Sequence, residues 1–190
     1  QILACLGALV IDADRVAHEV MRPGGPAFAG VVRAFGTGIL ADDGTIDRAR
    51  LGAIVFRDPE ALQSLEAAVH PATVAEIDRR IDAATEAVVV IEAIKLIEAG
   101  MHSRYDTLWV VTAPRPIQIA RLVSSRGMGE EEAGLRVDAQ PPQEAKVAVA
   151  DVVIENDGDL GHLQAQVQAA WANLMGSLLA GQCHTATQET

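Results

Sequence analysis

The 190-residue chain has no apolar run of about 18 residues, so no membrane span is expected. It has only two cysteines, Cys5 and Cys183, which lie far apart; we expect no disulfide framework and a reducing, cytoplasmic location. It also lacks clustered Lys and Arg, and its net charge of −11 argues against a nucleic-acid-binding protein. A local basic site can still bind phosphate, so phosphorylated small molecules stay open as ligands.

A phosphate-binding loop of the form G-x-x-x-x-G-K-[ST] is absent from the 190 residues. In ATP-binding proteins this loop supplies backbone N–H groups around the phosphates, a lysine for the β/γ oxygens and a hydroxyl for Mg²⁺. Neither glycine-rich stretch replaces it. Pro23-Gly24-Gly25-Pro26 has no Lys-Ser/Thr after it, and Gly36-Thr37-Gly38 precedes an apolar stretch.

Four short runs rich in apolar and β-branched residues predict buried parallel strands: Leu9–Ile11, Val88–Ile91, Leu108–Thr112 and Asp151–Ile154. Each run is followed by a polar residue or turn and then by a helical stretch, which is the pattern of an α/β fold. A hydrophobic content of 49% allows a real core, and the length fits one domain with an insertion or two small domains. We therefore predict an α/β core over residues 1–14 and 85–180.

No strand pattern appears between the first two runs, where residues 15–84 predict a helical insertion. Helices are expected at 15–22 and 27–35, and Asp58-Pro59-Glu60 opens another with proline at its first position. His70-Pro71 is expected to break that helix, and a second helix should run to about Ala84.

A short helical hairpin predicts a mobile lid over residues 122–142. Its first helix, 114–126, is expected to end at Gly127-Met128-Gly129. The second, 130–140, has an acidic first turn that suits the helix dipole and is closed by Pro141-Pro142. A final amphipathic helix over 160–180 is expected to precede a frayed tail, 181–190.

Two carboxylates, Asp12 and Asp14, follow the first strand where a helix begins. The carboxyl end of a strand is where open α/β sheets place their chemistry. Spacing alone leaves two interpretations of Asp14 open: it is a residue that takes part in the chemistry, or it is the helix N-cap, a position that aspartate favours. Asp12 also has two interpretations. It contacts the substrate or the surroundings of a metal ion, or it forms hydrogen bonds only with the nearby backbone.

Further motifs follow in a fixed order along the chain, and together they resemble the dephospho-coenzyme A kinase family. They are V-I-D-A-D-R-V-A-H at 10–18, D-G-T-I-D-R-A-R-L at 43–51, His70-Pro71, E-A-I-K-L-I-E-A-G at 92–100, Q-I-A-R-L at 118–122, R-V-D-A-Q at 136–140 and A-D-V-V-I-E-N-D-G at 150–158. The resemblance runs from about Leu6 to Trp171. Within it Glu92 keeps the charge of the family's pattern, whereas Lys95 stands where the family often has leucine.

The resemblance implies a P-loop-kinase-type α/β fold whose helical insertion binds the coenzyme A substrate. It implies that ATP, with Mg²⁺, phosphorylates the ribose 3′-hydroxyl of dephospho-CoA to give coenzyme A, the last step of coenzyme A biosynthesis. Asp14 is then the catalytic base and Arg126 neutralises the transferring phosphoryl group. The remaining implied contacts are substrate contacts by Asp12, His70 and Glu92, and nucleotide or phosphate contacts by Arg121, Arg136, Gln140 and Asn156. No residue is assigned as a metal ligand.

Measured against that family, the chain is expected to lack a first strand and its phosphate loop, since it begins at Gln1. We therefore expect the 190 residues alone to have little kinase activity. Two rivals stay open: another small-molecule kinase of this architecture, such as a nucleoside or nucleotide kinase, and a non-catalytic remnant that binds a coenzyme A-like ligand or a protein. The long insertion argues against the first, and the missing loop favours the second.

For single residues the alternatives are structural. Arg121 and Arg126 also fit a solvated helix face, His70 fits a helix end, and Asn156 fits an Asx turn. His18 is expected to be structural. The oligomeric state is left open by the sequence.

Overall fold

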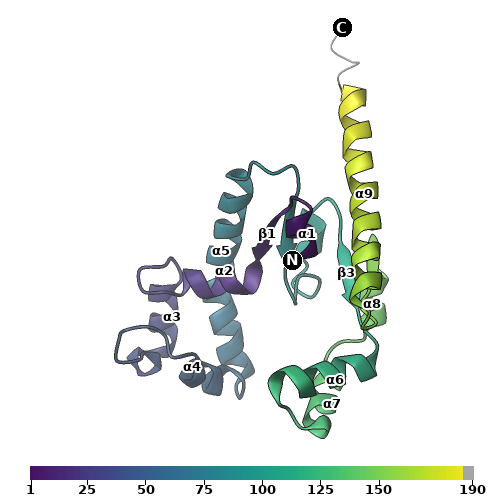
Figure 1. The fold of residues 1–190 in the computed structure, drawn as a ribbon. Helices are drawn as coiled ribbons and strands as arrows, with labels where there is room; N and C mark the ends of the chain where they lie inside the picture. Colours follow the sequence, from purple (N-terminus) through teal and green to yellow (C-terminus); the bar gives the residue numbers. More distant parts are fainter. Residues whose placement is uncertain (186–190) are drawn as a thin grey trace. The chain divides into compact units, whose positions relative to one another are not determined.

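The computed structural model describes residues 1–185, which form two compact units (Figure 1). The N-terminal unit comprises Leu3–Ile94 and the C-terminal unit begins at Lys95. Residues 186–190 of the predicted tail lie outside the described residues. The chain opens with the short helix α1 (Ile2–Cys5).

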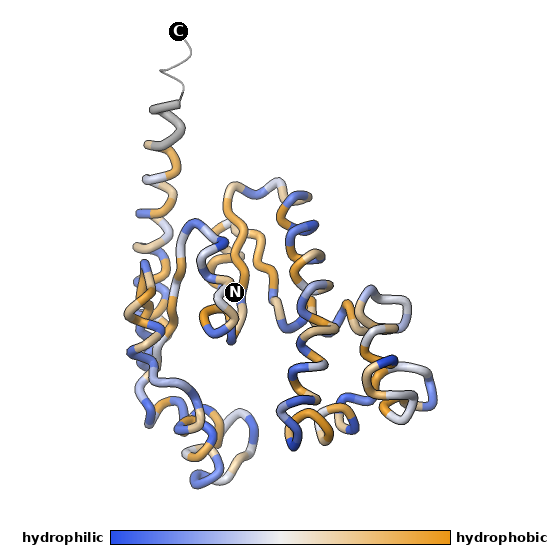
Figure 2. Tube along the Cα trace, turned by 180° about the vertical axis from the view of Figure 1, so that it is seen from behind, coloured by the Kyte–Doolittle hydropathy of each residue, from blue (hydrophilic) through white to orange (hydrophobic). Residues whose placement is uncertain are grey.

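The N-terminal unit contains a pair of parallel strands, and the helices of the unit lie between these two strands in the sequence. Its elements are β1 (Leu9–Asp12), α2 (Ala13–Val20), α3 (Phe28–Phe35), η1 (Thr37–Ile39), α4 (Arg48–Val55), α5 (Pro59–Asp82) and β2 (Val89–Glu92). In β1 and β2, Leu9 pairs with Val89 and Asp12 with Glu92. Figure 2 shows both strands as mostly hydrophobic. The first two predicted strands are therefore confirmed to within one residue.

The core of this unit lies between α5 and the helices around it. Val16 of α2, Val31 of α3 and Ile39 of η1 are fully buried, and Val69 and Ile77 of α5 face them. Between β1 and β2 the described residues form helices and turns, apart from one isolated bridge between Leu40 and Ile46. The segment predicted as a helical insertion is thus helical, while its role in substrate binding stays a prediction.

The predicted break at His70-Pro71 is wrong, because α5 runs without interruption from Pro59 to Asp82 with Pro71 inside it. The buried residues Val69, Thr73 and Ile77 lie on both sides of the proline. The Thr73 hydroxyl also donates to the Val69 carbonyl at 3.0 Å. Continuous packing of one face therefore outweighs the hydrogen bond that a proline removes.

The C-terminal unit also contains one parallel strand pair. Its elements are η2 (Met101–Arg104), β3 (Trp109–Thr112), α6 (Arg115–Arg126), α7 (Glu130–Asp138), α8 (Gln143–Val147), β4 (Val152–Glu155) and α9 (Leu160–Thr185). In β3 and β4, Trp109 pairs with Val152 and Thr112 with Glu155. The third and fourth predicted strands are confirmed. Helix α9 packs on β4 and runs on to Thr185 instead of ending near residue 180.

Helices α6 and α7 form the predicted hairpin. Gly127 ends α6 in the left-handed conformation, with φ of 64°, which glycine adopts at little cost. The prediction that this second helix reaches Gln140, on one helical face with Arg136, is wrong. Helix α7 ends at Asp138, so Gln140 lies beyond it. Arg115 of α6 binds Asp138 of α7 through two hydrogen bonds of 2.7 Å, which fasten the hairpin.

Candidate functional site

Carboxylates gather where β1 and β2 end. Asp12 and Glu92 are register partners at the last positions of the two strands, and Asp14 lies in the first turn of α2. All three residues are exposed. Parallel strands bring their carboxyl ends to one edge, so these side chains leave the sheet at the edge where α/β folds bind ligands.

The two aspartates have different local roles. Asp12 has extended backbone and is the N-cap of α2, where its Oδ1 accepts a hydrogen bond from the Arg15 N–H at 2.9 Å. The suggested N-cap role of Asp14 is therefore wrong, because the helix begins one residue before it. The Asp14 carboxylate has no hydrogen bond or ion pair among the described residues, so both oxygens are available.

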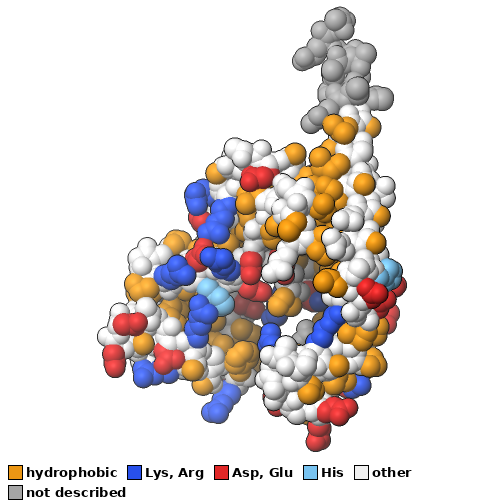
Figure 3. Space-filling view, in the orientation of Figure 1, with side chains coloured by type: hydrophobic (Ala, Val, Ile, Leu, Met, Phe, Trp, Pro, Cys, Tyr) orange, Lys and Arg blue, Asp and Glu red, His pale blue; other side chains and the backbone are white. Residues whose placement is uncertain are grey.

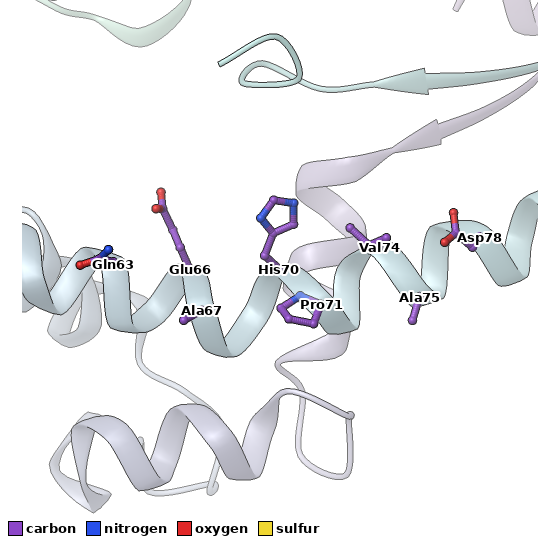
Figure 4. A pocket seen from close by; sticks show the side chains of 8 residues that line it. All are labelled: Gln63, Glu66, Ala67, His70, Pro71, Val74, Ala75 and Asp78. Atoms are coloured by element: carbon purple, nitrogen blue, oxygen red, sulfur yellow. The ribbon is translucent and has the colours of Figure 1, made fainter. Parts of the chain in front are cut away.

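His70 lies on the exposed face of α5, along an open groove of about 640 Å³. The groove is lined by small apolar and polar side chains of this one helix: Gln63, Glu66, Ala67, His70, Pro71, Val74, Ala75 and Asp78. Figure 4 shows Glu66 and His70 projecting from the same side of α5. The groove is thus mainly an apolar strip with a histidine and carboxylates along it.

A network of arginines and glutamates fastens α5 to α2. Glu19 of α2 binds Arg15 at 3.1 Å and also Arg80 of α5. Arg80 in turn binds Glu76 at 2.8 Å, and Arg79 binds Glu76 at the same distance. Hydrogen bonds from Arg79 and Arg80 lower the pKa of Glu76 to about 2. The network holds α2, and with it Asp14, on the long helix.

In the C-terminal unit, Arg121 and Asn156 meet. Asn156 follows β4, and its N–H donates to the Thr112 carbonyl at 2.8 Å. The Arg121 guanidinium donates to Asn156 Oδ1 at 2.7 Å and to its carbonyl at 3.3 Å. Two predicted nucleotide contacts are therefore neighbours at the carboxyl end of β4.

A second groove, of about 540 Å³, opens at the carboxyl ends of β3 and β4. Its lining consists of Thr112, Ala113, Pro114, Gln143, Glu144, Val147, Ala148, Glu155 and Asp157. Side-chain amides continue the strand pairing here: Gln143 binds the Ala113 N–H and carbonyl, each at 3.1 Å. Gln166 of α9 binds the Glu155 N–H and carbonyl, each at 2.9 Å, so the strand ends are held firmly.

The remaining predicted phosphate contacts are exposed on the hairpin and just after it. Arg126 is the last residue of α6, Arg136 lies on α7, and Gln140 follows α7. In the described part of the chain the guanidinium groups of Arg126 and Arg136 have no hydrogen bond or ion pair. Both are therefore available to an anionic ligand, unlike Arg115, which is bound by Asp138.

Among residues 1–180, whose side chains the structure describes, no group of three or more His, Cys, Asp or Glu side chains is arranged to hold a metal ion. No helix in the same range is both long enough and apolar enough to cross a membrane.

Parallel strand pairs flanked by helices, with carboxylates at the ends of the strands, are those of an α/β fold of the P-loop-kinase type. The family model described as dephospho-CoA kinase (CoaE) matches residues 1–162. The chain belongs to the dephospho-CoA kinase family. Members of this family are transferases that use ATP and catalyse the last step of coenzyme A biosynthesis.

Individual relatives carry the same name. The chain is 46% identical over 171 residues to the dephospho-CoA kinase of Streptomyces avermitilis, covering 89% of this chain and 83% of that protein. It is 42% identical over 181 residues to that of Moorella thermoacetica, covering 93% and 85%.

Solved structures agree. The crystal structure of TT1252 from Thermus thermophilus matches with a TM-score of 0.78 and 31% identity over 91% of this chain and 88% of that one. The dephospho-CoA kinase from Campylobacter jejuni matches with a TM-score of 0.66 and 26% identity over 93% and 90%.

Several positioning residues carry no signal in the sequence. The partners Arg115 and Asp138 are 23 residues apart, and Glu19 and Arg80 are 61 apart. Only the fold brings such pairs together. The N-cap at Asp12 does have a sequence signal, because aspartate is a favoured N-cap residue. Asp12 and Asp14 both carry this signal, so it does not show which of them caps α2.

Proposed function

We propose that Asp14 is the general base that activates the ribose 3′-hydroxyl of dephospho-CoA. The hydroxyl oxygen forms a bond to the γ-phosphorus of ATP, its proton passes to Asp14, and the bond from the γ-phosphorus to the β-bridging oxygen breaks to release ADP. The supporting observation is that the Asp14 carboxylate has no partner among the described residues, whereas Asp12 caps the same helix. A base needs this reach more than an unusual pKa.

The groups around Asp14 are proposed to hold the acceptor. Glu92 lies beside Asp12 at the strand ends, and His70 lies on the groove of α5 within the helical segment 15–84. Asp12 keeps its Oδ2 for the substrate or for water around a metal, since Oδ1 is occupied by the Arg15 N–H. Mg²⁺ in such sites is held chiefly by substrate phosphates and one or two carboxylates, and it would supply charge neutralisation there.

The C-terminal unit is proposed to hold the nucleotide. Arg126 and Arg136 suit contacts with phosphates because their guanidinium groups are exposed and unpaired in the described part of the chain. Arg121 fixes the turn at Asn156, which would then contact adenine. Gln140 is a further candidate phosphate contact, and residues 122–142 are the proposed lid.

The cellular location of the protein and the catalytic activity of these 190 residues are proposals as well. Cys5 is an exposed, unbridged thiol, which agrees with a reducing cytoplasm. No G-x-x-x-x-G-K-[ST] motif occurs in the 190 residues, so we propose that they have little turnover until a first strand and such a loop are added ahead of Gln1.

One experiment tests these proposals together. ATP-dependent phosphorylation of dephospho-CoA is measured for the 190 residues and for a version with the added strand and loop, and then for Asp14→Asn in that version. Turnover should fall by about 10²–10⁴ while the Kd of dephospho-CoA changes by less than about threefold. Asp42→Asn, in an exposed turn, is the matched control and should keep full turnover.

A fall of less than about threefold for Asp14→Asn would remove Asp14 from the role of base. Equal turnover with and without the added loop would show that the loop is dispensable.

A further inference from the structure

The turn that follows β4 contains Asn156, and helix α9 holds the residues on both sides of it. Gln166 of α9 binds the main chain of Glu155. His162 of α9 binds the carboxylate of Asp157, with Nδ1 and Oδ2 3.0 Å apart. Figure 3 shows a histidine beside acidic side chains near the start of α9. Nothing in the phosphoryl-transfer step described above uses His162.

The main chain of Glu155 fixes which way the Gln166 amide points. The Glu155 N–H can only donate, so it binds Gln166 Oε1, and the Glu155 carbonyl can only accept, so it binds Gln166 Nε2, each at 2.9 Å. The same Gln166 Nε2 lies 3.4 Å from His162 Nε2. Because an amide nitrogen is only a donor, the ring nitrogen that faces it has to be the acceptor.

This arrangement determines the tautomer of His162. With Nε2 as the acceptor, the proton of the neutral ring is on Nδ1, which donates to Asp157 Oδ2. That hydrogen bond lowers the pKa of Asp157, so its carboxylate stays ionised. The neutral ring therefore joins two residues of the turn: a chain of hydrogen bonds runs from Glu155 through Gln166 and His162 to Asp157.

Protonation of the ring breaks one link of this chain. An imidazole gains its proton between about pH 8 and pH 5, and His162 is exposed to solvent. The protonated ring carries an N–H on both nitrogens, so its Nε2 becomes a second donor facing the Gln166 amide. The charged groups around the ring are Asp157, Asp159, whose Oδ1 accepts the His162 N–H at 3.1 Å, and Glu155 at the end of β4, on which α9 packs. The contact with Asp157 becomes an ion pair, while the contact with Gln166 is lost.

We propose that His162, in its neutral form, is a positioning residue for the adenine of the bound nucleotide. The inference rests on the proposed function, in which Asn156 contacts adenine. Glu155 and Asp157 are the chain neighbours of Asn156, and both line the groove of about 540 Å³ at the strand ends. A bridge that fixes both neighbours also fixes the direction in which Asn156 points. Loss of the bridge as the pH falls therefore weakens the binding of the base.

The test is an NMR titration of the full chain with adenosine, which has the base but no phosphate that would itself gain a proton in this pH range. The Kd, read from the Asn156 amide, should rise about threefold to tenfold between pH 8 and pH 5, the equivalent of about one hydrogen bond. Nitrogen spectra should place the His162 proton on Nδ1 at pH 8, and the Gln166 amide should shift with the same midpoint as the ring. The Gln143 amide is the internal control. It binds the Ala113 N–H and carbonyl in the same way, but among the described residues no histidine is hydrogen-bonded to it, so it should not shift.

Three variants separate positioning from folding. His162→Ala loses both contacts and should bind adenosine about threefold to tenfold more weakly than the wild-type chain at pH 8, with no further loss at pH 5. His162→Asn keeps a donor for Asp157 but does not reach Gln166, so it should have an intermediate affinity that does not change with pH. Gln164→Ala removes an exposed glutamine from the same helix and should behave as the wild-type chain does.

The other outcomes overturn the inference in distinguishable ways. A proton on Nε2 of His162 at pH 8 would refute the chain of hydrogen bonds. An unchanged affinity in His162→Ala would remove His162 from the positioning role, and the same pH dependence in His162→Asn as in the wild-type chain would assign that dependence to another group. Adenosine that binds and moves the Asn156 signal equally at both pH values would refute this inference alone. If adenosine leaves that signal unmoved at pH 8, the proposed contact with adenine fails, and this inference with it.

Discussion

Replacing Pro71 by alanine should stabilise the protein, because α5 continues through this proline instead of ending at it. Proline costs about 3 kcal/mol relative to alanine inside a helix, since it leaves a carbonyl one turn earlier without its N–H partner. The stiffer unfolded chain of the proline form offsets up to about 1 kcal/mol of that cost. Pro71 is exposed, so little core packing is lost with its ring. The expected net gain is about 2–3 kcal/mol.

Urea and thermal unfolding followed by far-UV circular dichroism measure this gain. A gain of that size raises the Tm of a chain of this length by roughly 4–12 °C. Pro59→Ala is the matched control. Pro59 is at the first position of the same helix, where proline is favourable, and its replacement should give no gain. An unchanged or lower Tm for Pro71→Ala would contradict a continuous α5.

Two further predictions concern charge and motion. The pKa of Glu76 is lowered from 4.5 to about 2, so its ion pairs stabilise the fold above pH 4.5 and are lost as the pH falls toward 2. Glu76→Gln should remove that part of the acid dependence and cost about 1 kcal/mol at pH 7, read from urea unfolding at several pH values. Unchanged acid dependence would contradict the network's role. Residues 122–142 should exchange amide hydrogens more slowly when ATP is bound to the version with the added loop, and equal exchange in both states would indicate a fixed hairpin.

The strands and the helix ends were predictable because their signals are local. Apolar, β-branched runs gave all four strands to within one residue, and Gly127 and Pro59 marked a helix end and a helix start. Such signals depend on the backbone preferences of the residues themselves, so no tertiary contact is needed to read them.

The failures occurred where packing overrides local preference. Proline has the strongest helix-breaking preference of any residue, yet Val69, Thr73 and Ile77 keep one face of α5 buried on both sides of Pro71. In the same way the D-A-D motif fits a cap at either aspartate, and only the start of α2 decides between them. The pairing of Gln143 with Ala113 spans 30 residues and has no local signal at all.

The candidate site contains both kinds of residue, those with a local sequence signal and those placed only by tertiary packing. The residues that would do chemistry, such as Asp14, are recognisable in sequence because they follow a strand directly. The residues that place them are not, because Glu19 and Arg80 meet only after α2 and α5 pack together.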